Sequence, residues 1–173
     1  MTVQRIRTMG DPVLREVAEK LTKEEILSDE IKSLISDMDD SMRHAGGIGI
    51  AAPQIGVSKQ LTIIDVPDES RYEEATASER MIIFNPKIDF LTDEKDGYWE
   101  GCLSVPGLRG HVERPNHIRV TYLNELAQEV VIEVKGFLAT VFQHEIDHLF
   151  GKLYVDQMKD ITKLVYEENL QES

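Results

Sequence analysis

The sequence predicts an α+β fold, and two patterns support this prediction. Apolar residues recur at helical spacing near both ends of the chain, whereas its middle contains short runs rich in β-branched and aromatic residues. These runs follow one another without the strand–helix–strand alternation of a parallel sheet, so we expect mostly antiparallel strands. With 173 residues, no internal repeat and no Pro/Ser-rich linker, the chain is expected to form one domain over residues 1–173.

Two segments near the N-terminus are expected to be helical. Asp11-Pro12 is typical of a helix cap followed by proline in the first turn. A longer helix is expected from Ser28 to about Arg43, where the Gly-Gly pair at 46–47 ends it. The apolar residues expected to share one side of each helix are Val13, Leu14 and Val17 in the first segment and Ile31, Leu34, Ile35, Met38 and Met42 in the second.

The middle of the chain is expected to form strands. The predicted strands are Leu61–Val66, Met81–Phe84, Ile118–Leu123 and Val130–Val134. Asn124-Glu125 between the last two indicates a hairpin. The charged stretch Asp65–Arg80 is expected to be a solvated surface loop.

The C-terminal part is expected to return to helix. Phe137–Phe150 has a helical pattern that ends at Gly151, and a second amphipathic stretch begins at about Lys159. We therefore expect helices at both ends of the chain.

Composition narrows the function classes. The chain has 19 Lys plus Arg against 32 Asp plus Glu, a net charge of −13, which argues against binding DNA or an anionic membrane surface. The longest run without charged residues, Ala45–Ser58, is too short to span a bilayer, and no secretory signal is visible. One cysteine, Cys102, excludes an intrachain disulfide and fits a reducing compartment, so we expect a cytoplasmic protein.

The most informative segment is His144-Glu145-Ile146-Asp147-His148, within the helix predicted over Phe137–Phe150. Because residues four apart share a helix face, both histidines can bind one metal ion. Glu145 then lies beside the ion rather than on it, where it can move the protons of a water that the metal activates. The alternative is an amphipathic helix with two ordinary surface histidines, but a Glu between paired histidines in an otherwise apolar helix favours the metal site.

A catalytic site of this kind needs a third ligand. In one protease pattern a third histidine follows the glycine, but Tyr154 occupies that position here, which excludes that pattern. In another, a Glu about twenty residues downstream completes the site, and Glu167 or Glu168 could serve. Cys102 is the remaining candidate. A lone cysteine is usually an inert buried residue, but Cys102 lies in a strand-like segment after a glycine that permits close backbone approach.

Three motifs occur in order along the chain: GIGIAAPQ at 47–54, EGCLS at 100–104 and HEIDH at 144–148. These three motifs, in this order, resemble those of the peptide deformylase family. The sequence between them is compatible too, so the resemblance covers nearly the whole chain. The resemblance implies a hydrolase that removes the formyl group from the N-terminal formyl-methionine of newly made proteins and releases formate. It also implies a compact domain in which antiparallel sheets surround the metal-bearing helix.

The resemblance assigns roles to the motif residues. It implies one divalent metal ion, usually Fe(II) in the native enzymes and often replaced by Ni(II), Co(II) or Zn(II), with Glu145 as the general acid/base. The implied metal ligands are Cys102, His144 and His148. The side-chain amide of Gln54 and the backbone N–H of Leu103 are expected to face the formyl oxygen. Gly49 is expected to let an extended peptide pair with the protein backbone.

The methionine side chain requires an apolar slot, and Ile48, Phe137 and Val141 are its expected walls, although each is by default a core residue. The family pattern suggests that Glu100 and Arg114 form an ion pair bracing the Cys102 strand; the alternative is two exposed charges. Asp147 is expected either to orient a ligand histidine or to be a solvated helix residue. His44, His111 and His117 are interpreted as surface or structural residues.

The expected partners are N-formylmethionyl nascent peptides. Well-known family members dock on the ribosome with a basic C-terminal helix, whereas Lys159–Glu168 ends acidic here. Docking on ribosomal RNA through this tail is therefore not expected, and the ribosome contact stays open. Two alternatives to a deformylase remain: a metalloprotease with a downstream Glu ligand, and a structural zinc site, which needs four protein ligands.

Overall fold

The computed structural model describes residues 2–67 and 78–170. Its α-helices are α1 (Lys23–Ile26), α2 (Asp29–His44) and α3 (Gly136–His148). Its strands are β1 (Gly49–Ala51), β2 (Leu61–Ile64), β3 (Met81–Phe90), β4 (Lys95–Cys102), β5 (Val105–Pro115), β6 (His117–Leu123), β7 (Glu129–Lys135) and β8 (Leu164–Tyr166). The short 3-10 turns are η1 (Pro12–Arg15), η2 (Ala52–Ile55), η3 (Tyr154–Gln157), η4 (Ile161–Lys163) and η5 (Glu167–Asn169).

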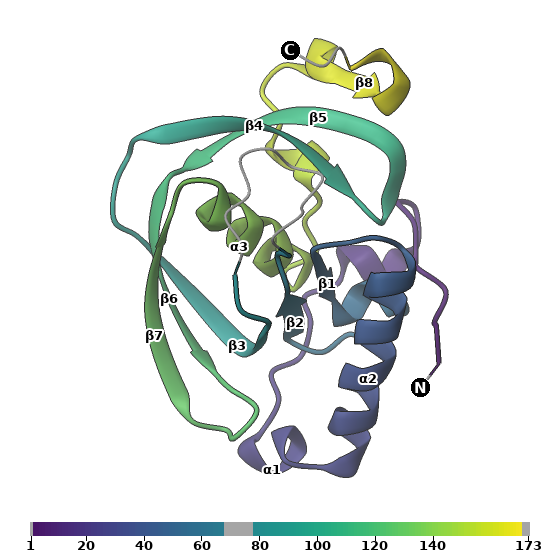
Figure 1. Ribbon diagram of the computed structural model, residues 1–173, viewed down its shortest axis with the longest axis vertical. Coiled ribbons are helices and arrows are strands. Elements are labelled where there is room, and N and C mark those ends of the chain that lie inside the picture. Colours follow the sequence, from purple (N-terminus) through teal and green to yellow (C-terminus); the bar gives the residue numbers. More distant parts are fainter. Residues whose placement is uncertain (1, 68–77, 171–173) are drawn as a thin grey trace.

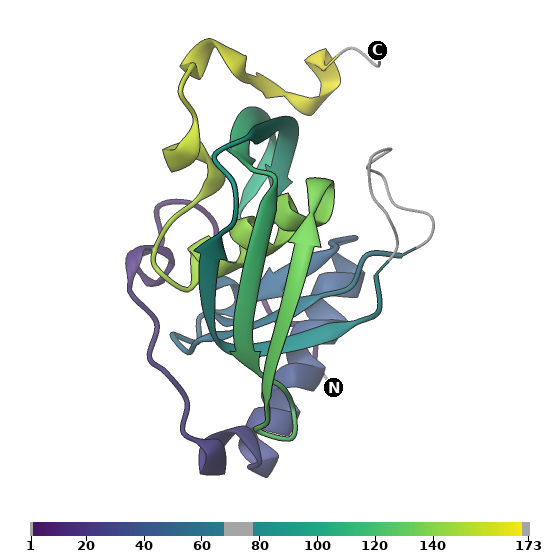
Figure 2. The same ribbon diagram turned by 90° about the vertical axis from the view of Figure 1, so that its left-hand side faces the viewer.

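Two antiparallel sheets surround helix α3 (Figure 1). The larger sheet has the strand order β1-β2-β3-β6-β7, and the smaller one has the order β4-β5-β8. Helix α2 packs against β1 and β2, while α3 packs between the larger sheet, where it contacts β1, β2, β6 and β7, and the β4-β5 hairpin. Figure 2 shows the C-terminal segment beyond α3 running along the smaller sheet. The predicted α+β class is confirmed.

Local sequence signals explain where the helices begin and end. The Ser28 side chain caps α2 by accepting a hydrogen bond from the Ile31 N–H, and Gly46 adopts a positive φ of 69° just after that helix. Asp11 caps the 3-10 turn that follows it, as expected, but that turn does not continue into an α-helix. Leu14 is buried there, whereas Val17 lies beyond the end of the turn and is 67% exposed, so Val17 does not share a helical face with Leu14.

The four predicted strands correspond to β2, β3, β6 and β7, and β6 and β7 form the expected hairpin. In its turn the Asn124 side chain accepts hydrogen bonds from the N–H groups of Leu126 and Gln128, which fixes the reversal. Of the stretch expected to be a surface loop, residues 68–77 lie outside the described residues.

The C-terminal segment does not form the expected helix. Residues 159–170 form no α-helix; they contain η4, the short strand β8 and η5. The Asp160 side chain accepts a hydrogen bond from the Thr162 N–H and closes a 3-10 turn, after which Leu164–Tyr166 pairs with the edge of β5. Pairing with a neighbouring strand thus overrides the amphipathic pattern of the segment. Within residues 2–67 and 78–170, no helix is both long and apolar enough to cross a membrane.

Candidate metal centre

Two elements bring three potential metal ligands together. Helix α3 carries His144 and His148 one turn apart, and Cys102 is the last residue of β4. Their ligand atoms all lie within 4.8 Å of one another, and Cys102 Sγ is 3.4 Å from His148 Nε2. Around a tetrahedral zinc ion, thiolate and imidazole ligands would be separated by about 3.6 Å. The three side chains therefore fit a single metal ion.

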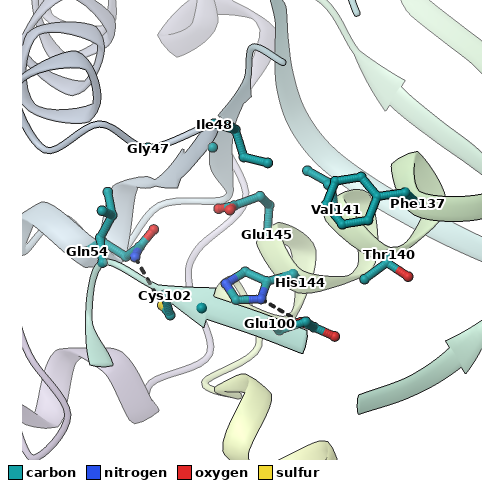
Figure 3. Close-up of a pocket in the computed structure, with 13 residues that line it drawn as sticks. Gly47, Ile48, Gln54, Glu100, Cys102, Phe137, Thr140, Val141, His144 and Glu145 are labelled. Atoms are coloured by element: carbon teal, nitrogen blue, oxygen red, sulfur yellow. Dashed lines mark hydrogen bonds and ion pairs between the residues drawn. The ribbon is translucent and has the colours of Figure 1, made fainter. Parts of the chain in front are cut away.

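A buried carboxylate orients the first histidine. Nδ1 of His144 lies 2.7 Å from Oε1 of Glu100, which directs the other ring nitrogen toward the thiol (Figure 3). A metal-binding histidine commonly has such a carboxylate on its second nitrogen, where it fixes the tautomer and the ring direction. Glu100 is thus the partner that selects Nε2 of His144 as the metal-facing atom.

Glu100 is itself held by a buried ion pair. Arg114 donates from Nε and Nη2 to the Glu100 carboxylate at 2.7 and 3.1 Å, and both side chains are 5% exposed. The predicted ion pair is therefore confirmed. Burial opposes the charge on Glu100, but the Arg114 guanidinium and the His144 hydrogen bond outweigh it and hold the pKa of this carboxyl below its usual range.

Asp147 joins the same network. Its Oδ2 accepts from Nη1 of Arg114 at 2.9 Å and from Nε2 of Gln157 at 3.2 Å. Asp147 therefore contacts the arginine that holds Glu100. It is not the solvated helix residue of the alternative interpretation.

His148 is buried next to the thiol. Burial, together with the positive charges of His144 and Arg114, lowers its pKa well below the usual histidine value. The neutral imidazole is the form that binds metals. Within the part of the chain that the structure describes, its Nδ1 has no hydrogen-bond partner.

Glu145 lies beside the three ligands rather than among them. Its carboxylate points into the pocket between Ile48 and His144 (Figure 3). Burial raises its pKa to about 7, with the nearby charge of His144 opposing this shift and that of Glu100 adding to it. Oε2 of Glu145 has no hydrogen-bond partner among the described residues.

Gln54 reaches the centre from the other side. It lies in the 3-10 turn η2, where its Oε1 accepts from the Ala51 N–H at 2.9 Å. Its Nε2 donates to Oγ of Ser104 at 3.1 Å and lies 3.6 Å from Cys102 Sγ (Figure 3). Leu103 follows the cysteine in the turn between β4 and β5 and also lines the pocket.

The pocket over these groups has apolar walls. Ile48, Phe137 and Val141 line it, as the sequence suggested, and the glycines 47, 49 and 101 line it as well. Phe137 is held by an edge-to-face contact with Tyr98, with ring centroids 5.2 Å apart and planes at 81°. The pocket therefore offers an apolar slot next to a potential metal ion.

Several other candidates lie outside the centre. Neither Glu167 nor Glu168 belongs to the group of described side chains that could hold the ion, and Glu167 instead accepts a hydrogen bond from Nε of Arg109 at 2.8 Å. The alternative interpretation, a metalloprotease whose third ligand is a downstream Glu, is therefore wrong. The described group has three members, whereas a structural zinc site is closed by four.

Two residues of the site were not found from the sequence. Ser104 is fully buried, accepts from Gln54 and donates its N–H toward Cys102 Sγ at 3.4 Å. Thr140 lines the pocket one turn before His144. Their positions, two residues after the cysteine and four before the histidine, were the only signals available.

Comparison with known proteins identifies the family. The family model described as polypeptide deformylase matches residues 3–164. This chain belongs to the polypeptide deformylase family. Deformylases remove the N-formyl group from nascent peptides, so the chain is a hydrolase of protein biosynthesis.

Relatives and solved structures support this assignment. The deformylase is 46% identical over 171 residues to peptide deformylase of Leptospira biflexa, covering 98% of this chain and 96% of the relative. It is 46% identical over 168 residues to peptide deformylase 1 of Bordetella pertussis, covering 97% and 94%.

Among solved structures, a K4U-bound class I type b peptide deformylase from Acinetobacter baumannii matches with a TM-score of 0.87 and 34% identity, covering 92% of this chain and 100% of that one. The peptide deformylase from Thermotoga maritima matches with a TM-score of 0.81 and 36% identity, with the same coverage. The antiparallel sheets around a metal-site helix are thus the fold of this family.

Proposed function

We propose that this deformylase hydrolyses the formyl amide with Cys102, His144 and His148 as the metal ligands and Glu145 as the general acid/base. One observation carries the proposal: the three potential ligand atoms lie within 4.8 Å of one another, and two of the three residues line a pocket that the adjacent Glu145 carboxylate also lines. The divalent ion would lower the pKa of water and polarise the formyl carbonyl.

We propose Fe(II) as the native ion, on the strength of the family resemblance. A thiolate and two imidazoles also suit Ni(II), Co(II) and Zn(II), so the ligand types alone do not select among them. Metal analysis of protein purified without added metal and without oxygen tests this assignment.

Glu145 would move the protons of the reaction. Its carboxylate would accept a proton from the attacking water and then deliver it to the departing amine nitrogen as the formyl C–N bond breaks, so that the products are formate and a peptide whose N-terminal methionine carries a free amine. Burial and the lack of a described hydrogen-bond partner at Oε2 leave this oxygen available for both transfers.

Gln54 and Leu103 would stabilise the charge that develops on the former carbonyl oxygen. The Gln54 amide is held by Ala51 and Ser104, so its donor group is positioned before substrate arrives. Such preorganised donors stabilise a transition state because they need no reorganisation during the reaction. The backbone N–H of Leu103 is proposed as the second donor.

The pocket would select the substrate in two ways. Ile48, Phe137 and Val141 form an apolar slot for the methionine side chain. Glycines 47, 49 and 101 also line the pocket, and their backbone would lie close to the reacting carbon, so that the methyl of an acetyl group would overlap with it.

Gly49 would bind the peptide backbone. It lies on β1, an edge strand of the larger sheet, and β4 is an edge strand of the smaller sheet. Residues of both strands line the pocket, so an extended peptide can add to a free strand edge there. Gly49 has no side chain that would block this approach.

The substrates would be N-formylmethionyl nascent peptides, and the whole chain, residues 1–173, would act as one catalytic unit in the cytoplasm, where ribosomes work. Transient ribosome association follows from this substrate, but Lys159–Glu168 is not proposed as the contact, because this stretch ends with two glutamates.

Formate release tests the proposed function. The enzyme is loaded with Fe(II) without oxygen and given a formyl-Met peptide, with the matching acetyl-Met peptide as control. Release of formate from the first peptide alone supports the proposal. Absence of formate, with the metal bound stoichiometrically, would refute it.

A further inference from the structure

The ring of His144 has a neighbour on its face that the proposed mechanism does not use. The Tyr154 ring lies nearly parallel to it, with centroids 6.0 Å apart and an interplanar angle of 19°. Tyr154 is only 1% exposed, which places this contact deep in the protein. An offset parallel arrangement at this separation is a favourable aromatic contact.

The contact complements the hydrogen bond at the ring's edge. Glu100 fixes Nδ1 of His144, but a hydrogen bond to a carboxylate tolerates a broad range of directions and so leaves the ring free to tilt. A metal ion bound by imidazole lies in the ring plane, because the nitrogen lone pair lies there. A flat group against the ring face therefore controls where the ion can sit.

Tyr154 is itself firmly placed. It packs in one apolar cluster with Cys102, so it touches the environments of two potential ligands. A Cβ built on Gly110 of β5 would come within 2.8 Å of Tyr154 Cε2, so the strand backbone backs the ring directly. The turn η3 that carries Tyr154 is also tied to α3, because Gln157 donates to Asp147.

We propose that Tyr154 is a positioning residue that sets the plane of the His144 ring and thereby the geometry and retention of the metal ion. The inference rests on the metal ligands of the proposed function, but not on formyl hydrolysis. A leucine at position 154 would preserve burial and lose the flat face, whereas a phenylalanine would preserve both.

The test measures the metal rather than activity. Wild type, Tyr154→Leu and Tyr154→Phe are loaded with Co(II), whose visible absorption reports ligand geometry, and Co(II) release to excess chelator is timed. Replacing groups that orient metal ligands typically costs about 10–100-fold in metal affinity. We expect Tyr154→Leu to release Co(II) at least about tenfold faster with shifted visible bands, and Tyr154→Phe to match wild type.

Phe84→Leu is the matched control, since Phe84 is a fully buried aromatic residue of a different apolar cluster. It should lower the melting temperature without changing the spectrum or the release rate. If Tyr154→Leu does not fold, Tyr154→Met takes its place with the same expectation. The proposal would be overturned if Tyr154→Leu kept the wild-type release rate and spectrum. It would also be overturned if Phe84→Leu released Co(II) as fast as Tyr154→Leu. Because catalysis is not measured, failure of the proposed hydrolysis would leave this result unaffected.

Discussion

Gly49 lies so close to Glu145 that a Cβ on the glycine would come within 2.5 Å of Oε1 and 2.7 Å of Cδ. Side-chain atoms do not approach to such distances, so any larger residue at this position would require the Glu145 side chain or strand β1 to shift. The backbone of β1 therefore forms one wall around the proposed general acid/base and restricts where its carboxylate can point.

Replacing Gly49 by alanine should displace the Glu145 carboxylate and lower kcat by at least about 100-fold, the lower range for a lost general acid/base. Metal content should stay stoichiometric, because the three ligands are not touched. Steady-state kinetics and metal analysis measure both. If the glycine acts through Glu145, adding Gly49→Ala to a Glu145→Gln enzyme should lower kcat little further. If the kcat losses of the two single variants multiplied in the double variant, that result would contradict this coupling.

Glu145→Gln should retain the metal and abolish turnover. The amide keeps the shape of the side chain but cannot accept a proton from water, so about 100-fold to 10,000-fold of rate should be lost. Formate release together with metal analysis checks the prediction, and Glu94→Gln, at an exposed position, is the control. Loss of metal from Glu145→Gln would show that the residue ligates the ion, against its proposed role.

The pair of histidines on helix α3 could be predicted from the sequence because it depends only on the spacing of neighbouring residues. His144, Glu145 and His148 owe their relative positions to helical spacing alone, and the structure retains that spacing. The Glu100–Arg114 pair could be suggested only through the resemblance, since the two residues meet across paired strands.

Strands β4 and β5 could not be predicted in full for the same reason. Their sequences, KDGYWEGC and VPGLRGHVERP, contain glycines, prolines and charges that disfavour a strand locally, and it is their mutual pairing that makes them strands. Tyr154 illustrates the limit most clearly. Ten residues separate it from His144, and only the turn after α3 brings the two rings together.

Arg114→Met should destabilise the protein and loosen the metal. The change takes the guanidinium from the buried Glu100 carboxylate and leaves it only the His144 hydrogen bond. Breaking a buried ion pair by removing one partner typically costs about 3–5 kcal/mol of unfolding free energy. Denaturant unfolding of the metal-free protein measures this cost, and Co(II) release measures the effect on His144. The double variant Glu100→Gln/Arg114→Met removes both charges and should recover part of the unfolding free energy. A double variant less stable than Arg114→Met alone would contradict the stated cause.

Formyl-Met peptides should be cleaved far faster than acetyl-Met peptides. The acetyl methyl would have to fit in the pocket that glycines 47, 49 and 101 line, where the proposed close approach of their backbone leaves it no space. Comparison of kcat/KM for two peptides that differ only in the acyl group tests this argument. Comparable values would refute the close fit. A difference confined to KM would place the discrimination in ground-state binding.

Sensitivity to oxygen follows from the proposed ion and from the single thiol of the chain. Fe(II) is redox-active, and in this enzyme it would be bonded to Cys102, the only cysteine among the 173 residues. Oxidation of the iron, or of the thiolate to sulfenic acid, changes the metal's charge or removes a ligand. Without a second cysteine, no intramolecular disulfide can form to rescue the oxidised sulfur.

The Fe(II) enzyme should therefore lose activity in air much faster than the Ni(II) enzyme, because nickel does not readily change oxidation state under these conditions. Mass spectrometry of the inactivated iron enzyme should show metal loss or oxygen added at Cys102, and equal decay of the two forms side by side would contradict the argument.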